Sequence, residues 1–73
     1  MKLGKRISEL RERKQITQGE LAQIIGVTRA ALSHYENDRR QPDYDTLMKI
    51  AKFFSVSVEY VIEGNENSTQ IQG

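Results

Sequence analysis

The sequence contains no cysteine and no tryptophan, and only one proline among its 73 residues. Without cysteine the chain can form neither disulfides nor a thiolate metal site, and this favours a reducing compartment. No apolar run approaches the roughly 18 residues of a membrane-spanning helix. The basic start MKLGKR is not followed by the apolar stretch of a signal peptide. These absences predict a cytoplasmic protein that does not enter a membrane.

Signals for catalysis and cofactor binding are also missing. The sequence has no glycine-rich phosphate loop and no cluster of ligands at the spacing of a metal site. Ser33 and His34 are adjacent, but neighbouring residues of a helix point about 100° apart and cannot act as nucleophile and base. The sequence therefore predicts no enzyme, no catalytic residue, no metal and no cofactor.

The charge is nearly balanced but unevenly distributed, with 11 Lys and Arg against 10 Asp and Glu. Residues 1–42 hold nine basic and five acidic side chains, whereas residues 43–73 hold two and five. A basic half can steer a protein toward a polyanion even when the net charge is close to zero. Small asymmetries of this kind are also common in proteins that bind no polyanion.

Helical periodicity is what the sequence does contain, and no strand pattern reaches comparable strength. A chain of this length has room for one domain with one core. Five segments with apolar stripes predict helices over residues 3–14, 18–25, 29–36, 44–54 and 58–63. Start signals are the capping box Thr17–Glu20, the caps Thr28, Asp43 and Ser57, and Pro42 before the fourth segment; stop signals are Gly26 and Gly64. The polar stretch 65–73 predicts a flexible tail or the start of a linker.

The second and third segments are separated by little more than Gly26. Two helices joined by so tight a turn must cross steeply, and their backbones approach closely. Ala22 is small where it faces the next helix, and Leu32 can fill the wedge between the two. We therefore expect a rigid unit that holds its second helix out from the body of the protein.

The third segment has one apolar and one polar face. Ala31, Leu32 and Tyr35 fall on the apolar side, and Tyr35 is expected in the core together with Leu47 and Phe54. The other side carries Arg29, Ala30, Ser33, His34 and Asn37. A helix fits the major groove of B-form DNA, and small Ala30 and Ser33 would allow close approach. Arg29 could then bond a guanine, and His34 a purine N7 or a thymine methyl group; the alternative for each is an ordinary solvated side chain.

Four motifs together carry a family resemblance: T-Q-x-E-L-A-x-x-x-G-V, S-x-Y-E-N, R-x-P-D and T-L-x-x-I-A. They resemble the helix-turn-helix domain of phage repressors, Cro proteins and Xre-like bacterial regulators. The resemblance implies an all-α, compact five-helix bundle with its helix-turn-helix at about 17–36, in a DNA-binding domain of residues 1–64. The departure from the family pattern is Asp38, where glycine is frequent; aspartate tolerates the left-handed conformation, but its charge would lie near phosphates.

The resemblance also implies roles for individual residues. The implied base-reading residues are Arg29, Ala30, Ser33 and His34. The residues expected beside the DNA backbone are Thr17, Gln18, Thr28, Asn37, Arg39, Arg40 and Arg11, and those expected to support the structure are Ala22, Gly26, Leu32 and Glu36. Arg11 and Glu36 are expected to pair across two helices, partly buried, so that Arg11 is oriented toward a phosphate.

The function predicted from these observations is sequence-specific binding of double-stranded DNA by a transcriptional regulator, with repression as the expected effect. One small domain exposes few base-reading groups, so we expect a homodimer, formed in solution or only on DNA, on a palindromic operator. The alternative is a protein-interaction or antitoxin-type module that grips a partner through Tyr60, Val61 and Ile62 in the last helix. A partner could also be bound by a further C-terminal domain.

Overall fold

The computed structural model describes residues 3–64, and over that range the chain forms five helices and no strand. The helices are α1 (Leu3–Arg13), α2 (Gln18–Ile25), α3 (Arg29–Glu36), α4 (Tyr44–Phe54) and α5 (Val58–Glu63). The predicted all-α fold is therefore confirmed, and each of the five helices lies where its apolar stripe predicts it. The segment predicted as a polar tail or linker, residues 65–73, lies outside the described residues.

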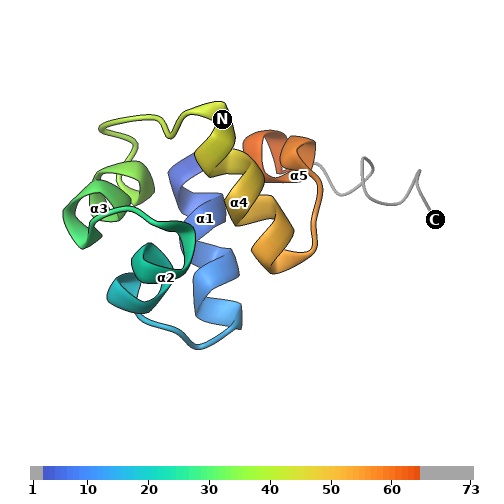
Figure 1. The fold of residues 1–73 in the computed structure, drawn as a ribbon. Coiled ribbons are helices and arrows are strands. Elements are labelled where there is room, and N and C mark those ends of the chain that lie inside the picture. The colour runs from blue at the N-terminus through green and yellow to red at the C-terminus, as the bar shows by residue number, and fades with distance from the viewer. Residues whose placement is uncertain (1–2, 65–73) are drawn as a thin grey trace.

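α1 lies between α3 and α5 and contacts both of them (Figure 1). α2 and α3 contact one another directly, as do α4 and α5, and α2 also contacts α4. In this view α3 lies at one side of the molecule and α5 at the other. The arrangement leaves one side of α3 uncovered by the other helices.

The helix ends follow the local signals in the sequence. The side-chain oxygens of Thr17, Thr28, Asp43 and Ser57 each accept a hydrogen bond of 2.9–3.1 Å from the backbone N–H three residues later. Gly26 and Gly64 end α2 and α5 in the left-handed conformation, with φ of 79° and 66°. Each of these contacts satisfies a backbone group that the helix itself leaves without a partner.

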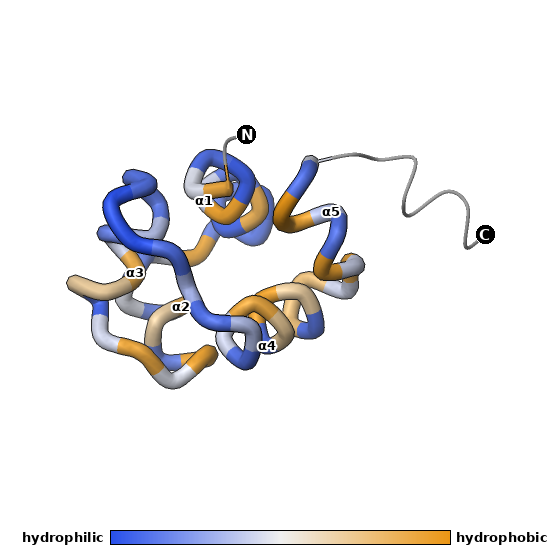
Figure 2. The backbone as a smooth tube through the Cα atoms, turned by 90° about the horizontal axis from the view of Figure 1, so that it is seen from above, coloured by the Kyte–Doolittle hydropathy of each residue, from blue (hydrophilic) through white to orange (hydrophobic). Residues whose placement is uncertain are grey.

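The core takes side chains from every helix. Those with almost no exposed surface are Ile7, Leu21, Ile25, Leu32, Ile50 and Val61. Tyr35, Leu47 and Phe54 are buried as predicted. Lys14, which directly follows α1, places its Nζ 5.5 Å from the centre of the Phe53 ring. Figure 2 shows that the connection from α3 to α4 is hydrophilic, in contrast to the apolar residues that α1, α4 and α5 contribute to the core.

No helix within residues 3–64 has the length and apolar character needed to cross a bilayer.

Candidate nucleic-acid interface

The turn between α2 and α3 is fixed by backbone hydrogen bonds and by two buried side chains. Gly26 is left-handed, and the next amide, that of Val27, donates to the Ala22 carbonyl at 2.9 Å. Thr28 then caps α3. Ala22 and Leu32 are both buried in the core. The turn at Gly26, the cap at Thr28 and the burial of Ala22 and Leu32 thus agree with the sequence analysis, and α3 packs directly against α2.

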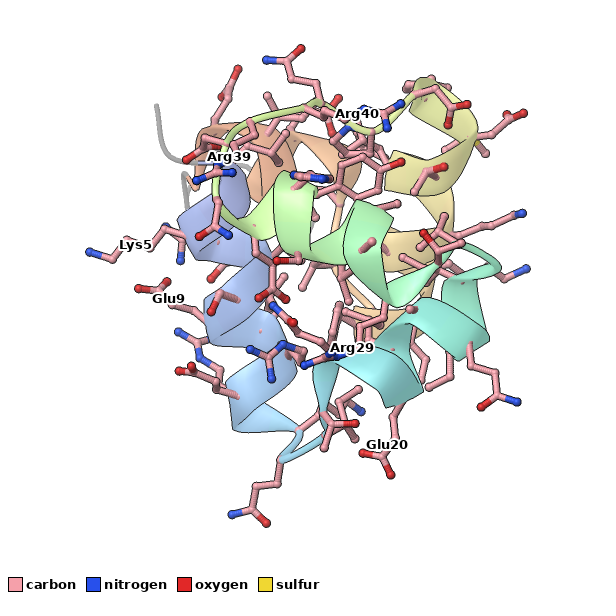
Figure 3. The ribbon with its side chains drawn as sticks, turned by 90° about the vertical axis from the view of Figure 1, so that its left-hand side faces the viewer. Lys5, Glu9, Glu20, Arg29, Arg39 and Arg40 are labelled. Carbon is pink, nitrogen blue, oxygen red and sulfur yellow. The ribbon has the colours of Figure 1, made fainter. Side chains whose placement is uncertain are left out.

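α3 is buried on one side and open on the other. Leu32 and Tyr35 lie in the core, whereas Arg29 and Ala30 are exposed and Ser33 and His34 are half-buried. The structure therefore brings the four predicted base-reading residues onto one accessible ridge, with small residues between larger donors. Figure 3 looks onto this side of the molecule, where Arg29 lies beside α2 and Arg39 and Arg40 lie toward the loop after α3.

Glu36, in the last turn of α3, is the centre of a hydrogen-bonded cluster behind the ridge. Its Oε2 accepts from Arg11 Nε at 2.8 Å, and its Oε1 accepts from Arg11 Nη2 at 3.2 Å and from Gln18 Nε2 at 2.9 Å. Arg11 Nη1 also donates to the Ile16 carbonyl at 2.9 Å. The predicted Arg11–Glu36 pair is confirmed, and it links α1, α2 and α3.

This cluster is largely shielded from solvent. The side chain of Glu36 is 5% exposed and that of Arg11 is 15% exposed. The hydrogen bonding of the Arg11 guanidinium to the Glu36 carboxylate is the main reason that the pKa of Arg11 is raised above its ordinary value. Gln18, predicted to contact a phosphate, gives one amide N–H to Glu36 and retains a second at the start of α2. The sequence did not indicate this link between Gln18 and Glu36.

The loop after α3 carries the other predicted backbone contacts. Asn37, Arg39 and Arg40 are exposed, and Asn37 Nδ2 lies 3.5 Å from Ser33 Oγ. Between them, Asp38 adopts a left-handed conformation with φ of 60° and accepts a hydrogen bond from the Gly4 amide. Neither Gly4 nor this contact was predicted, although a glycine in the first turn of an amphipathic helix is a signal for close packing.

The surface predicted for a protein partner is wrong in part. Tyr60 is 5% exposed and Val61 is fully buried, so they belong to the chain's own core, and Ile62 is half-buried against that core. The cause is the packing of α5 on α1. Arg6 lies 5.0 Å from the centre of the Tyr60 ring and donates to the Gly64 carbonyl at 3.3 Å. Tyr60 and Val61 therefore cannot grip a partner while α5 stays docked.

Comparison with known proteins agrees with this geometry. The sequence model of the family described as Helix-turn-helix matches residues 7–61. The chain is 41% identical over 68 residues to the HTH-type transcriptional regulator ImmR of Bacillus subtilis, covering 93% of this chain and 54% of that protein. This chain thus spans about half the length of the first curated relatives it matches.

Solved structures also share the fold, and two of them illustrate the similarity. The crystal structure of the P22 c2 repressor in complex with synthetic operator 9T aligns with a TM-score of 0.84 at 28% identity, covering 89% of this chain and 98% of that one. The N-terminal DNA-binding domain of SinR from Bacillus subtilis aligns with a TM-score of 0.77 at 31% identity, covering 84% and 90%. The shared fold includes the paired helices that carry the exposed ridge.

Proposed function

The chain belongs to the helix-turn-helix family, and from that membership we propose that it is a sequence-specific DNA-binding regulator of transcription, with repression as its effect. α3 would enter the major groove while the start of α2 meets the DNA backbone. Residues 1–64 would form the DNA-binding domain. We propose that the protein binds DNA rather than catalysing a reaction, in agreement with the names of the relatives, and that it acts in the cytoplasm.

The observation that carries this proposal is the two-sided character of α3. Leu32 and Tyr35 anchor the helix in the core, while Arg29 and Ala30 project from it. A helix used only for packing would gain little from an exposed strip of hydrogen-bond donors with small residues between them. The P22 repressor, whose fold is the same, was crystallised with an operator, and this supports the same use of the ridge here.

Individual residues take distinct roles in the proposal. Arg29, Ala30, Ser33 and His34 would meet base edges in the major groove. The residues proposed to contact the DNA backbone are Thr17, Gln18, Thr28, Asn37, Arg39, Arg40 and Arg11. Arg11 still has two N–H groups without a partner, since three of its five donate to Glu36 and Ile16. A phosphate beside the 15% exposed side chain could accept from them.

We further propose that the protein acts as a homodimer, which forms either in solution or when two copies bind the operator. A single ridge reads few base pairs, and a dimer would read two half-sites about one helical turn apart. In a longer protein, as the curated relatives are, additional chain could supply an oligomerisation or sensor domain. The alternative of a protein-interaction or antitoxin-type module has less support, because Tyr60 and Val61 are buried.

The test is selection of binding sites from random-sequence duplex DNA by the purified protein. We expect enrichment of an inverted repeat whose half-sites are centred about 10 base pairs apart. The control is the same selection with Arg29→Ala, which should lose preference at one position of each half-site. A pool that stays random after repeated rounds, with no duplex bound at low salt, would contradict the proposed function.

A further inference from the structure

Asp38 fastens the loop after α3 to the beginning of α1. Its Oδ1 accepts a hydrogen bond of 2.9 Å from the Gly4 amide, across 34 residues of sequence. The first amides of a helix have no partner within the helix, and a carboxylate placed there also faces the positive end of the helix dipole. Asp38 therefore caps α1 from a distant part of the chain.

Gly4 makes this contact possible. A Cβ atom at position 4 would overlap the carbonyl oxygens of Tyr35 and Glu36, so the first turn of α1 lies directly against the end of α3. No other residue type fits there without moving the two helices apart. The start of α1 therefore touches the end of α3 through its backbone. The hydrogen bond from the Gly4 amide to Asp38 adds a second contact, between α1 and the loop that follows α3.

Asp38 also forms the turn that ends α3. The Asp38 amide donates to the Tyr35 carbonyl at 3.2 Å, and the Arg39 amide donates to the His34 carbonyl at 2.9 Å. This pair of bonds around a left-handed residue is a Schellman motif, in which glycine is the usual left-handed residue. A glycine would make the turn equally well but offers no acceptor to Gly4. The turn alone therefore does not account for an aspartate at this position.

We propose that Asp38 is a positioning residue for the DNA interface, which acts by tethering the loop of Asn37, Arg39 and Arg40 to α1 before DNA binds. This inference rests on the proposed function. Figure 3 shows Arg39 on the same side of the molecule as Lys5, which follows Gly4 in α1. The tether reduces the conformational freedom that the exposed loop would otherwise lose on binding.

The carboxylate also has an opposing effect, because its negative charge would lie near phosphates. Two substitutions separate the effects. Asp38→Asn removes the charge but keeps a side-chain oxygen for Gly4 and tolerates the left-handed conformation. Asp38→Gly also keeps the turn and removes the charge, but it has no acceptor. The asparagine and glycine variants therefore share the turn and the neutral charge, and they differ in whether a side-chain acceptor is present for the Gly4 amide.

The first measurement is the affinity of the wild type and both variants for the selected operator duplex, well below their melting temperatures. Asp38→Asn should bind about twofold more tightly than the wild type, the size expected for losing one repulsion across ~8 Å of water. Asp38→Gly should bind roughly two- to tenfold more weakly than Asp38→Asn, the change expected for one net hydrogen bond. Equal affinities of the two variants would overturn the proposal.

The second measurement needs no DNA. Amide hydrogen exchange at Gly4 in the free protein should be slow in the wild type and in Asp38→Asn, and several-fold faster in Asp38→Gly. Equal exchange in the two variants would show that the tether does not form, whatever the affinities. If the exchange rates differ as expected but the wild type binds no duplex, it is the proposed function that fails, and the role of Asp38 in DNA binding fails with it.

Discussion

Arg29 and Arg39 carry the same charge and are both exposed, but their places predict different effects on binding. Arg29 starts α3 on the proposed base-reading ridge, whereas Arg39 lies in the following loop. A bidentate contact to a base discriminates against the wrong base by about 1–3 kcal/mol. A contact to a phosphate contributes equally for every sequence.

We therefore expect Arg29→Ala to weaken operator binding by about 1–3 kcal/mol while leaving binding to a scrambled duplex almost unchanged. Arg39→Ala should weaken binding to both duplexes by the same factor. Fluorescence anisotropy titrations of both variants on both duplexes make the comparison. If Arg29→Ala weakens both duplexes equally, Arg29 does not read a base.

Glu36 differs from an ordinary surface acid because it satisfies donors from two other helices. Glu36→Ala would leave the Arg11 guanidinium shielded and without its main partner. We expect a loss in the free energy of unfolding of about 3 kcal/mol, at the lower end of the range for a broken buried pair because Arg11 is still 15% exposed. Urea denaturation at neutral pH measures the loss.

The matched control for this change is Glu9, which pairs with Arg6 at 3.1 Å but is 38% exposed. Glu9→Ala should cost about 0–1 kcal/mol, as is usual for a solvated ion pair. Equal losses for Glu36→Ala and Glu9→Ala would show that the cluster around Glu36 adds nothing to an ordinary surface pair.

The helix-turn-helix element depends on one backbone conformation, that of Gly26 with φ of 79°. Space does not require glycine there, because the nearest atom to an added Cβ would be Lys49 Nζ at 4.0 Å. Gly26→Ala should therefore destabilise the protein by about 1–2 kcal/mol through backbone strain alone.

Gly19 offers the opposite case within the same element. It lies in α2 with a right-handed backbone, and an added Cβ would meet Arg29 Cδ and Thr17 Oγ1 at an ordinary 3.9 Å. Gly19→Ala should stabilise the protein by up to about 0.5–1 kcal/mol. Thermal and urea denaturation of the Gly19→Ala and Gly26→Ala variants tests both predictions. If the two substitutions changed the stability in the same direction, the backbone explanation for Gly26 would be contradicted.

Across the whole molecule, the basic residues lie mostly in the half that carries the interface. Residues 1–42 hold nine of the 11 Lys and Arg. If each protomer of a dimer neutralises about five phosphates, the logarithm of the binding constant should fall with the logarithm of the salt concentration with a slope near −9. Titrations between 50 and 200 mM salt would show this slope, and affinity that does not change over that range would be incompatible with the proposed interface.

The ends and faces of the helices follow from the sequence, because the interactions that set them are local. The N-caps of α2, α3, α4 and α5 each join a side chain to an amide three residues away, and Gly26 stops α2 through its own backbone freedom. The wheel of α3 likewise places Leu32 and Tyr35 inside and Arg29 outside. These features make the ridge predictable from the order of residues, and the family resemblance supplied the Arg11–Glu36 pair.

Contacts between distant parts of the chain were not predictable in this way. The Gly4–Asp38 hydrogen bond, the Gln18–Glu36 hydrogen bond and the burial of Tyr60 and Val61 all depend on the angles and distances at which helices pack. No short-range pattern encodes those angles, since they result from how all five apolar faces fill one core. Residue order thus fixes which side chains α3 presents, whereas the packing of the helices fixes how firmly they are held.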